Sequence, residues 1–117
     1  MFFSRDIDAK IDRWADKGMI GKLARAAYEE PDEKSRAKAY AAMGRIRDES
    51  SVEALFQCFK LQETKLVRLS AAKALGKIAT KKEFDTIQHI INIETDEEVR
   101  EVLNESAIEA KDRAARW

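Results

Sequence analysis

An internal repeat of 32 residues constrains the fold of this chain more than any other feature of its sequence. Arg36, Arg68 and Arg100 are separated by this interval, and residues 40–46 resemble residues 72–78 position by position. A period of this length is typical of solenoids, in which copies of one supersecondary unit stack and bury a continuous core. The same interval relates three further sets of residues: Ala39, Ala71 and Leu103; Met43, Leu75 and Ala107; and Ile46, Ile78 and Ala110.

Each copy of the repeat carries two stripes of apolar residues with helical spacing. In the first stripe they recur at i, i+4, i+8 and i+11, and in the second at i, i+3 and i+7, so each copy is predicted to form two helices. The N-terminal residues fit the same register as a divergent first copy, with Phe3, Ile7, Ile11 and Trp14 at the apolar positions. The predicted helices span residues 4–17, 19–30, 33–47, 51–61, 65–79, 81–93 and 97–115.

Residues that start and stop helices fall between these segments. A side-chain oxygen at a helix start can accept a hydrogen bond from a free backbone N–H group. Residues of this kind precede the first helices at Ser4, Asp32, Thr64 and Asp96, and the second helices at Ser50 and Thr80. Gly18 and the single Pro31 mark breaks between helices. Gly44 and Gly76, one repeat apart, are expected to permit close helix packing.

The composition agrees with a helical protein. Hydrophobic residues make up 44% of the 117 residues and charged residues 38%, with four glycines and one proline. This is too apolar for a disordered chain and too poor in turn residues for a many-stranded β fold. The predicted fold is all-α, a right-handed α–α superhelix of about seven helices in one domain over residues 1–117. Its repeats span about residues 1–31, 32–63 and 64–95, with a half repeat over 96–117.

The repeat resembles the HEAT repeat, and is most similar to the short HEAT-like subtype first noted in phycobilisome lyases. The resemblance rests on Val-Arg at residues 67–68 and 99–100, and on Ala-Leu-Gly-Lys-Ile at residues 74–78. It implies an architecture that serves mainly as an interaction scaffold, without pointing to one process. By the same resemblance, an arginine of the first helix is expected to bond between neighbouring repeats. The residues at this position are Arg36, Arg68 and Arg100.

The repeat register also indicates which reactive residues belong to the core. Cys58 aligns with Ala26 and Ile90, so we expect a packed core thiol, whereas His89 aligns with polar residues and is expected at the surface. A Cys–His nucleophilic pair is therefore not expected. The chain has no Cys-x-x-Cys, no histidine pair, no calcium loop and no glycine-rich phosphate loop. We expect no catalytic residue, no metal and no cofactor, and an enzyme is the third hypothesis.

The exposed stripe of the second helices is the predicted binding surface. In a solenoid of this type these helices tend to line the concave side. Their outward positions combine donors, acceptors, both charges and aromatic rings, which suits a protein or peptide partner, although an ordinary solvated face is the alternative. The candidate partner-binding residues are Arg25, Tyr28, Glu53, Phe56, Gln57, Lys60, Asp85, Gln88, His89 and Asn92.

A net charge of zero hides a strong asymmetry along the chain. Residues 33–82 carry 12 basic and 5 acidic side chains, whereas residues 83–109 carry 1 basic and 9 acidic side chains. Nucleic-acid binding by the basic segment is therefore the second hypothesis. It is weakened because many of these bases belong to first helices, on the expected convex side. They are Lys34, Lys38, Arg45, Lys73 and Lys77.

The two ends of the solenoid suggest a further contact, a homodimer or docking on a larger assembly. The acidic stretch could also meet the basic segment of a second molecule. No apolar run approaches the roughly 20 residues that span a bilayer, and the N-terminus lacks a signal-peptide core. A single cysteine suits a reducing compartment, so we expect a cytoplasmic protein. The apolar residues expected to be available at the ends are Phe2, Phe3, Ala107, Ile108, Ala110 and Trp117.

Overall fold

The structure, a computed structural model, describes residues 3–114, with side chains from residue 6 onward. Within these residues every regular element is helical, as expected from the repeat. The elements are α1 (Phe3–Asp16), α2 (Ile20–Glu29), α3 (Glu33–Met43), α4 (Glu49–Lys60), α5 (Lys65–Ile78), the short 3₁₀ helix η1 (Lys81–Glu83), α6 (Phe84–Ile93) and α7 (Glu97–Asp112).

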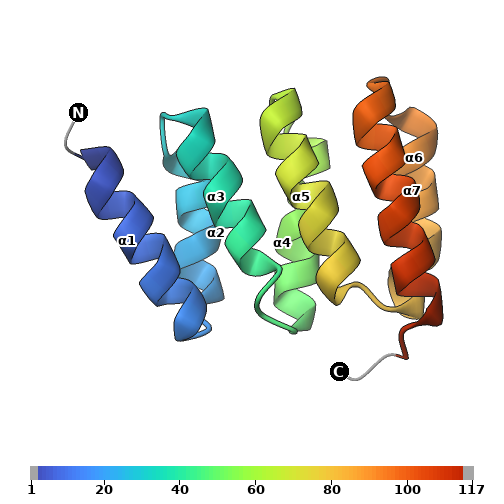
Figure 1. The fold of residues 1–117 in the computed structure, drawn as a ribbon, viewed down its shortest axis with the longest axis horizontal. Coiled ribbons are helices and arrows are strands. Elements are labelled where there is room, and N and C mark those ends of the chain that lie inside the picture. Colours follow the sequence, from blue (N-terminus) through green and yellow to red (C-terminus); the bar gives the residue numbers. More distant parts are fainter. Residues whose placement is uncertain (1–2, 115–117) are drawn as a thin grey trace.

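The helices form two layers of a helical repeat solenoid. The first helices of the repeats, α1, α3, α5 and α7, stand side by side in one row, which we call the first-helix layer (Figure 1). The second helices, α2, α4 and α6, lie behind them as the second-helix layer (Figure 1). The Cα atoms extend over 40 × 31 × 17 Å. Neighbouring first helices pack extensively on each other, whereas each second helix packs mainly on the first helix of the next repeat.

Equivalent positions of successive repeats build one continuous core. Leu23, Leu55 and Ile87 lie one repeat apart in the second helices and are all completely buried. In the first helices the positions of Ile11, Met43, Leu75 and Ala107 are related in the same way and are at most 1% exposed. Full burial of a large aliphatic side chain contributes roughly 1.5–3 kcal/mol to stability. Because the same positions are buried in each repeat, stacking the repeats lengthens one continuous core.

Glycine sets the spacing of the first-helix layer, as the register predicts. A Cβ atom added to Gly44 in the turn after α3 would lie 3.1 Å from the Cα of Ala74 on α5. One repeat later, a Cβ at Gly76 would lie 2.8 Å from the Oγ of Ser106 on α7. Both distances are shorter than ordinary carbon contacts, so a larger side chain would force neighbouring first helices apart.

The helix α1 departs from this pattern. Asp12 occupies the position that Gly44 and Gly76 hold in the later repeats. Its carboxylate instead forms ion pairs with two bases of the second repeat, at 3.2 Å from Lys38 and 3.5 Å from Arg45. A polar contact therefore replaces close backbone packing between the first and second repeats.

Most predicted helix caps are confirmed. Asp32, Thr64 and Asp96 accept hydrogen bonds from backbone N–H groups at the starts of α3, α5 and α7. Thr80 caps η1 in a capping box with Glu83. Gly18 has a φ of +66° in the break between α1 and α2, a conformation that glycine adopts without strain.

Two predicted caps and two helix ends were wrong, since α7 stops at Asp112 and not at residue 115. Ser4 lies inside α1, and Ser50 lies inside α4, where its backbone N–H donates a 2.8 Å hydrogen bond to the true cap, Asp48. The Asp48 carboxylate also accepts from the Ser50 hydroxyl, and these two bonds lower its pKa. The helix α3 ends at Met43 and not at residue 47, because the chain turns at Gly44 where it approaches α5.

Candidate protein-interaction surface

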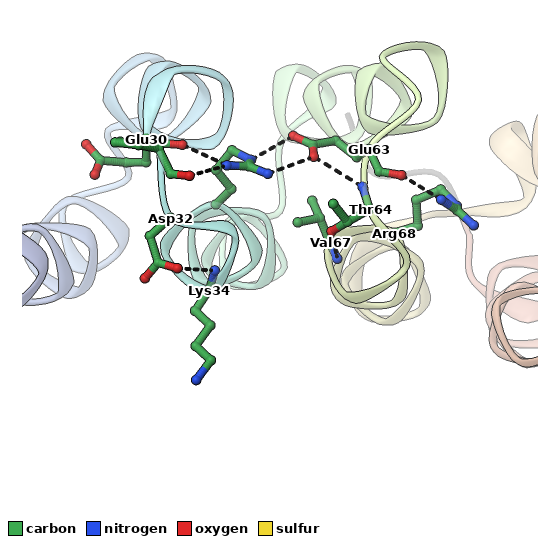
Figure 2. Close-up of polar contacts among 9 residues, drawn as sticks. Glu30, Asp32, Lys34, Glu63, Thr64, Val67 and Arg68 are labelled. Carbon is green, nitrogen blue, oxygen red and sulfur yellow. Dashed lines mark hydrogen bonds and ion pairs between the residues drawn. The ribbon is translucent and has the colours of Figure 1, made fainter.

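Two of the three repeat-equivalent arginines join neighbouring repeats, which makes them structural. Arg36 donates through Nη1 to the carbonyl oxygens of Glu30 and Pro31, and through Nε and Nη2 to the carboxylate of Glu63 (Figure 2). Arg68 repeats the arrangement with the carbonyl of Glu63 and the carboxylate of Glu94. The linkers between repeats are therefore held by guanidinium groups, as the family resemblance implies.

The third arginine of this series is different. Arg100 on α7 is exposed, and its side chain makes no hydrogen bond or ion pair within residues 3–114. The expectation of an inter-repeat bond is thus confirmed for Arg36 and Arg68 but not for Arg100. The carboxylates that Arg36 and Arg68 bind come from the linker after the following second helix, and no second helix follows α7 in the described part of the chain.

The reactive residues lie where the register places them. Cys58 is completely buried in α4, and burial, reinforced by the negative charge of Glu63, raises the pKa of its thiol to about 12. His89 on α6 is exposed. In the segment from residue 3 to residue 114, no group of three or more His, Cys, Asp or Glu side chains could hold a metal ion.

The predicted partner-binding residues all lie on the second-helix layer. Tyr28 is the most exposed aromatic among them, with 67% of its surface accessible, while Phe56 and Gln88 are half-buried. Arg25 forms an exposed ion pair with Glu29 at 3.1 Å. The remaining candidates are exposed along α4 and α6: Glu53, Gln57, Lys60, Asp85, His89 and Asn92.

An apolar groove runs between α2 and α4 and brings some of these candidates together. Tyr28 lines its α2 wall and Gln57 its α4 wall, and the groove encloses a volume of about 250 Å³. Phe56 and the candidates on α6 do not contribute to it. The other lining residues are Ala24, Tyr40, Met43, Ala54 and Leu61. Ala24 on α2 and Ala54 on α4 both line this space, and their small side chains do not fill it.

Sequence reasoning missed the base of this groove. Tyr40 and Met43 come from α3 in the first-helix layer and are buried at 2% and 0% exposure. The Tyr40 hydroxyl has no hydrogen-bond partner in the described part of the chain, and burial raises its pKa. The repeat register held a signal for the groove, since Ala24 stands where the next two repeats have Phe56 and Gln88.

A second hollow, of about 500 Å³, lies between α1 and α2 at the N-terminal end of the array. Its wall includes Ile7 and Trp14, with the Nζ of Lys22 placed 6.0 Å from the centre of the Trp14 ring. Charged residues of both helices line the rest of this hollow, among them Lys10, Arg25 and Glu29.

The bases of the first-helix layer fall into two groups. Lys38 and Arg45 are in ion pairs with α1, whereas Lys34, Lys73 and Lys77 have none within residues 3–114. A shallow hollow of about 660 Å³ lies where α3, α5 and α7 end. Its charged lining residues are Arg45, Arg47, Lys77, Glu109 and Arg113.

Only some of the apolar residues predicted to be exposed at the solenoid ends are exposed. Ile108 is 65% exposed, but Ala107 and Ala110 are buried because they face the core side of α7. Phe2 and Trp117 lie outside the described residues, and for Phe3 only the backbone is described. Among the described helices, none is long and apolar enough to cross a membrane.

Comparison with known protein families finds one match. A family model for HEAT repeats matches residues 21–108, which covers three quarters of the chain and includes α2 to the middle of α7. Searches of curated proteins and of solved structures found no significant match.

Proposed function

Because the chain belongs to the HEAT-repeat family, we propose that it is a non-catalytic module that binds a protein or peptide on its second-helix layer. HEAT repeats commonly mediate protein–protein interaction or scaffolding, and the family is typically non-enzymatic. The short HEAT-like subtype, the cytoplasmic location and a homodimer through the solenoid ends stay predictions.

The groove between α2 and α4 is the observation that carries this proposal. It contains residues predicted from sequence on both walls, Tyr28 and Gln57, and its lining is mostly apolar. A peptide side chain that enters such a space loses water from both surfaces, and this desolvation drives binding. An exposed aromatic ring such as Tyr28 beside the entrance is a common anchor in protein interfaces.

Polar groups at and near the groove would select which peptides bind there. Tyr40 lines the groove and its hydroxyl makes no hydrogen bond within the described residues, so it is free to bond to a donor or acceptor of an incoming peptide. Lys60, next in sequence to the groove residue Leu61, is exposed and unpaired within the described residues. We therefore expect a peptide with an apolar side chain flanked by a hydrogen-bonding group and an acidic residue.

A groove-filling substitution tests the proposal. Ala24→Phe places in α2 the side chain that Phe56 supplies one repeat later, so it should fill the groove without disturbing the fold. Ala41→Phe, an exposed position of α3 in the opposite layer, is the matched control. Proteins captured from native cells by the wild type and by Ala41→Phe, but lost with Ala24→Phe, would be partners of the groove. Capture of the same proteins by all three forms would refute it.

Nucleic-acid binding is the second candidate function, and the hollow at the ends of α3, α5 and α7 favours it. Four cations line this hollow with one carboxylate, and Arg47 and Lys77 are unpaired within the described residues. Replacing both by alanine should weaken retention on nucleic acid and reduce its salt dependence. If the wild type is not retained at low salt, this candidate fails.

A further inference from the structure

The outer face of the first-helix layer changes its charge between α5 and α7. Lys73 and Lys77 are exposed on α5, one turn apart. The residues one repeat later are Glu105 and Glu109, exposed on α7. Positions that are equivalent in the repeat thus carry opposite charge on two adjacent, parallel helices (Figure 1).

These charges are largely without ion-pair partners in the described part of the chain. Lys73, Lys77 and Glu105 form no ion pair within residues 3–114, and Glu109 has only a 3.9 Å contact with Arg113. Lys73 and Glu105 line opposite walls of a groove of about 320 Å³ between α5 and α7, but they lie too far apart to pair. Within the described residues, the face therefore holds a basic and an acidic stripe that are free to bind a partner.

The strip between the two stripes is apolar. Leu69 lies two turns before Gly76, on the side of α5 that faces α7, and Val102 lies one turn before Ser106, on the side of α7 that faces α5. Both side chains are half-buried and pack on the core. Leu66 near the start of α5 is 40% exposed. An apolar centre with charged borders is the usual anatomy of a protein interface.

We propose that this face binds a second copy of the same chain, with a two-fold axis that runs along the groove between α5 and α7. Such an axis places α5 of one molecule opposite α7 of the other, because it exchanges the two sides of the groove. Lys73 then faces the partner's Glu105 and Lys77 faces the partner's Glu109, and the symmetry repeats both contacts. Leu69 and Val102 meet their own copies near the axis.

A second copy fits this surface better than a partner of one charge. An acidic protein or a nucleic acid would satisfy the lysines but would be repelled by the glutamates beside them. Two helices per chain form an interface at the small end of the range for specific complexes, so the dimer should be weak and sensitive to salt. The second-helix layer stays open in the dimer and could still bind a partner.

Charge reversal with complementary rescue tests this proposal. The variants Lys73→Glu/Lys77→Glu and Glu105→Lys/Glu109→Lys should each dimerise roughly a hundredfold more weakly than the wild type in sedimentation equilibrium at low salt. An equimolar mixture of the two should form a heterodimer, because each charge again meets its opposite. Lys34→Glu, an exposed reversal on α3 in the same layer, should leave dimerisation unchanged.

Three results would overturn the proposal. The wild type could remain monomeric at every concentration and salt tested, or both double reversals could dimerise as well as the wild type. The mixture could also fail to form a heterodimer although each variant retains native helical content by circular dichroism. A dimer that survives both reversals would instead support contact through the solenoid ends.

Discussion

Arg68 holds the carboxylate of Glu94, 26 residues further along the chain, through two hydrogen bonds of 3.0 Å each. The Glu94 side chain is only 5% exposed, so this guanidinium is its main compensation for lost water. The same arginine also binds the carbonyl oxygen of Glu63 in the preceding linker. One side chain from α5 therefore connects the linkers on both sides of its repeat.

Replacing Arg68 by alanine should destabilise the protein by about 2–3 kcal/mol, because it leaves the buried Glu94 carboxylate unpaired. Arg100→Ala provides a matched control at the equivalent position, where the side chain is exposed and unpaired within the described residues. That control should change stability by less than about 0.5 kcal/mol. Urea unfolding followed by circular dichroism measures both, and equal losses would contradict a structural role specific to Arg68.

Two glycines in helices should respond to alanine with opposite signs. A Cβ at Gly76 would meet the Ser106 Oγ at 2.8 Å, and that hydroxyl is fixed by its hydrogen bond to the Ala72 carbonyl. Gly76→Ala should therefore cost about 1–3 kcal/mol through overpacking. Gly21 in α2 has nothing within 4 Å of the added atom, so Gly21→Ala should stabilise the protein by up to about 1 kcal/mol. Thermal unfolding of the two variants checks the difference in sign.

Helical content and core positions could be predicted from the sequence, because a repeated apolar stripe has one way to be buried. The contacts made by the linkers between repeats could not be predicted in this way. Arg36 finds its acceptor 27 residues later and Arg68 finds its acceptor 26 residues later, so a strict period of 32 misplaces the second carboxylate. Linkers bend without helical periodicity, and sequence spacing does not fix which oxygen reaches the guanidinium.

The candidate surface, too, could be predicted from the sequence only in part. The register correctly placed Tyr28, Gln57 and His89 at the surface, since their equivalents in other repeats are mostly polar. The small residue Ala24 was its one signal of the groove, whose shape depends on how far α2 lies from α4 and on Tyr40 beneath them. At the start of α4, Asp48 and Ser50 are both good caps two residues apart, and only the backbone geometry shows that Asp48 is used.

The buried thiol of Cys58 should make stability depend on pH in alkaline solution. Burial raises its pKa from 9.0 to about 12, so the native state favours the uncharged thiol. This contribution is fully present below pH 9 and is lost as the pH rises toward 12, because the unfolded chain then releases the proton first. The stability advantage of the wild type over Cys58→Ala should therefore shrink above pH 9. A constant difference between the two proteins from pH 7 to pH 11 would show that the thiol does not behave as a buried group.

The first repeat should open before the rest of the array. Ion pairs of Asp12 and Asp16 with Lys38 and Arg45 replace the glycine contact found in later repeats, and all four side chains are 35–72% exposed. Exposed pairs contribute at most about 1 kcal/mol each and are screened in about 1 M salt. Hydrogen exchange should therefore be faster in α1 than in α5, and salt or Asp12→Asn should accelerate α1 alone. If the amides of α1 and α5 instead exchange at the same rate, with the same response to salt, the first repeat unfolds together with the rest of the array. In that case the buried side chain of Ile11 couples α1 to the core, and the ion pairs do not determine its stability.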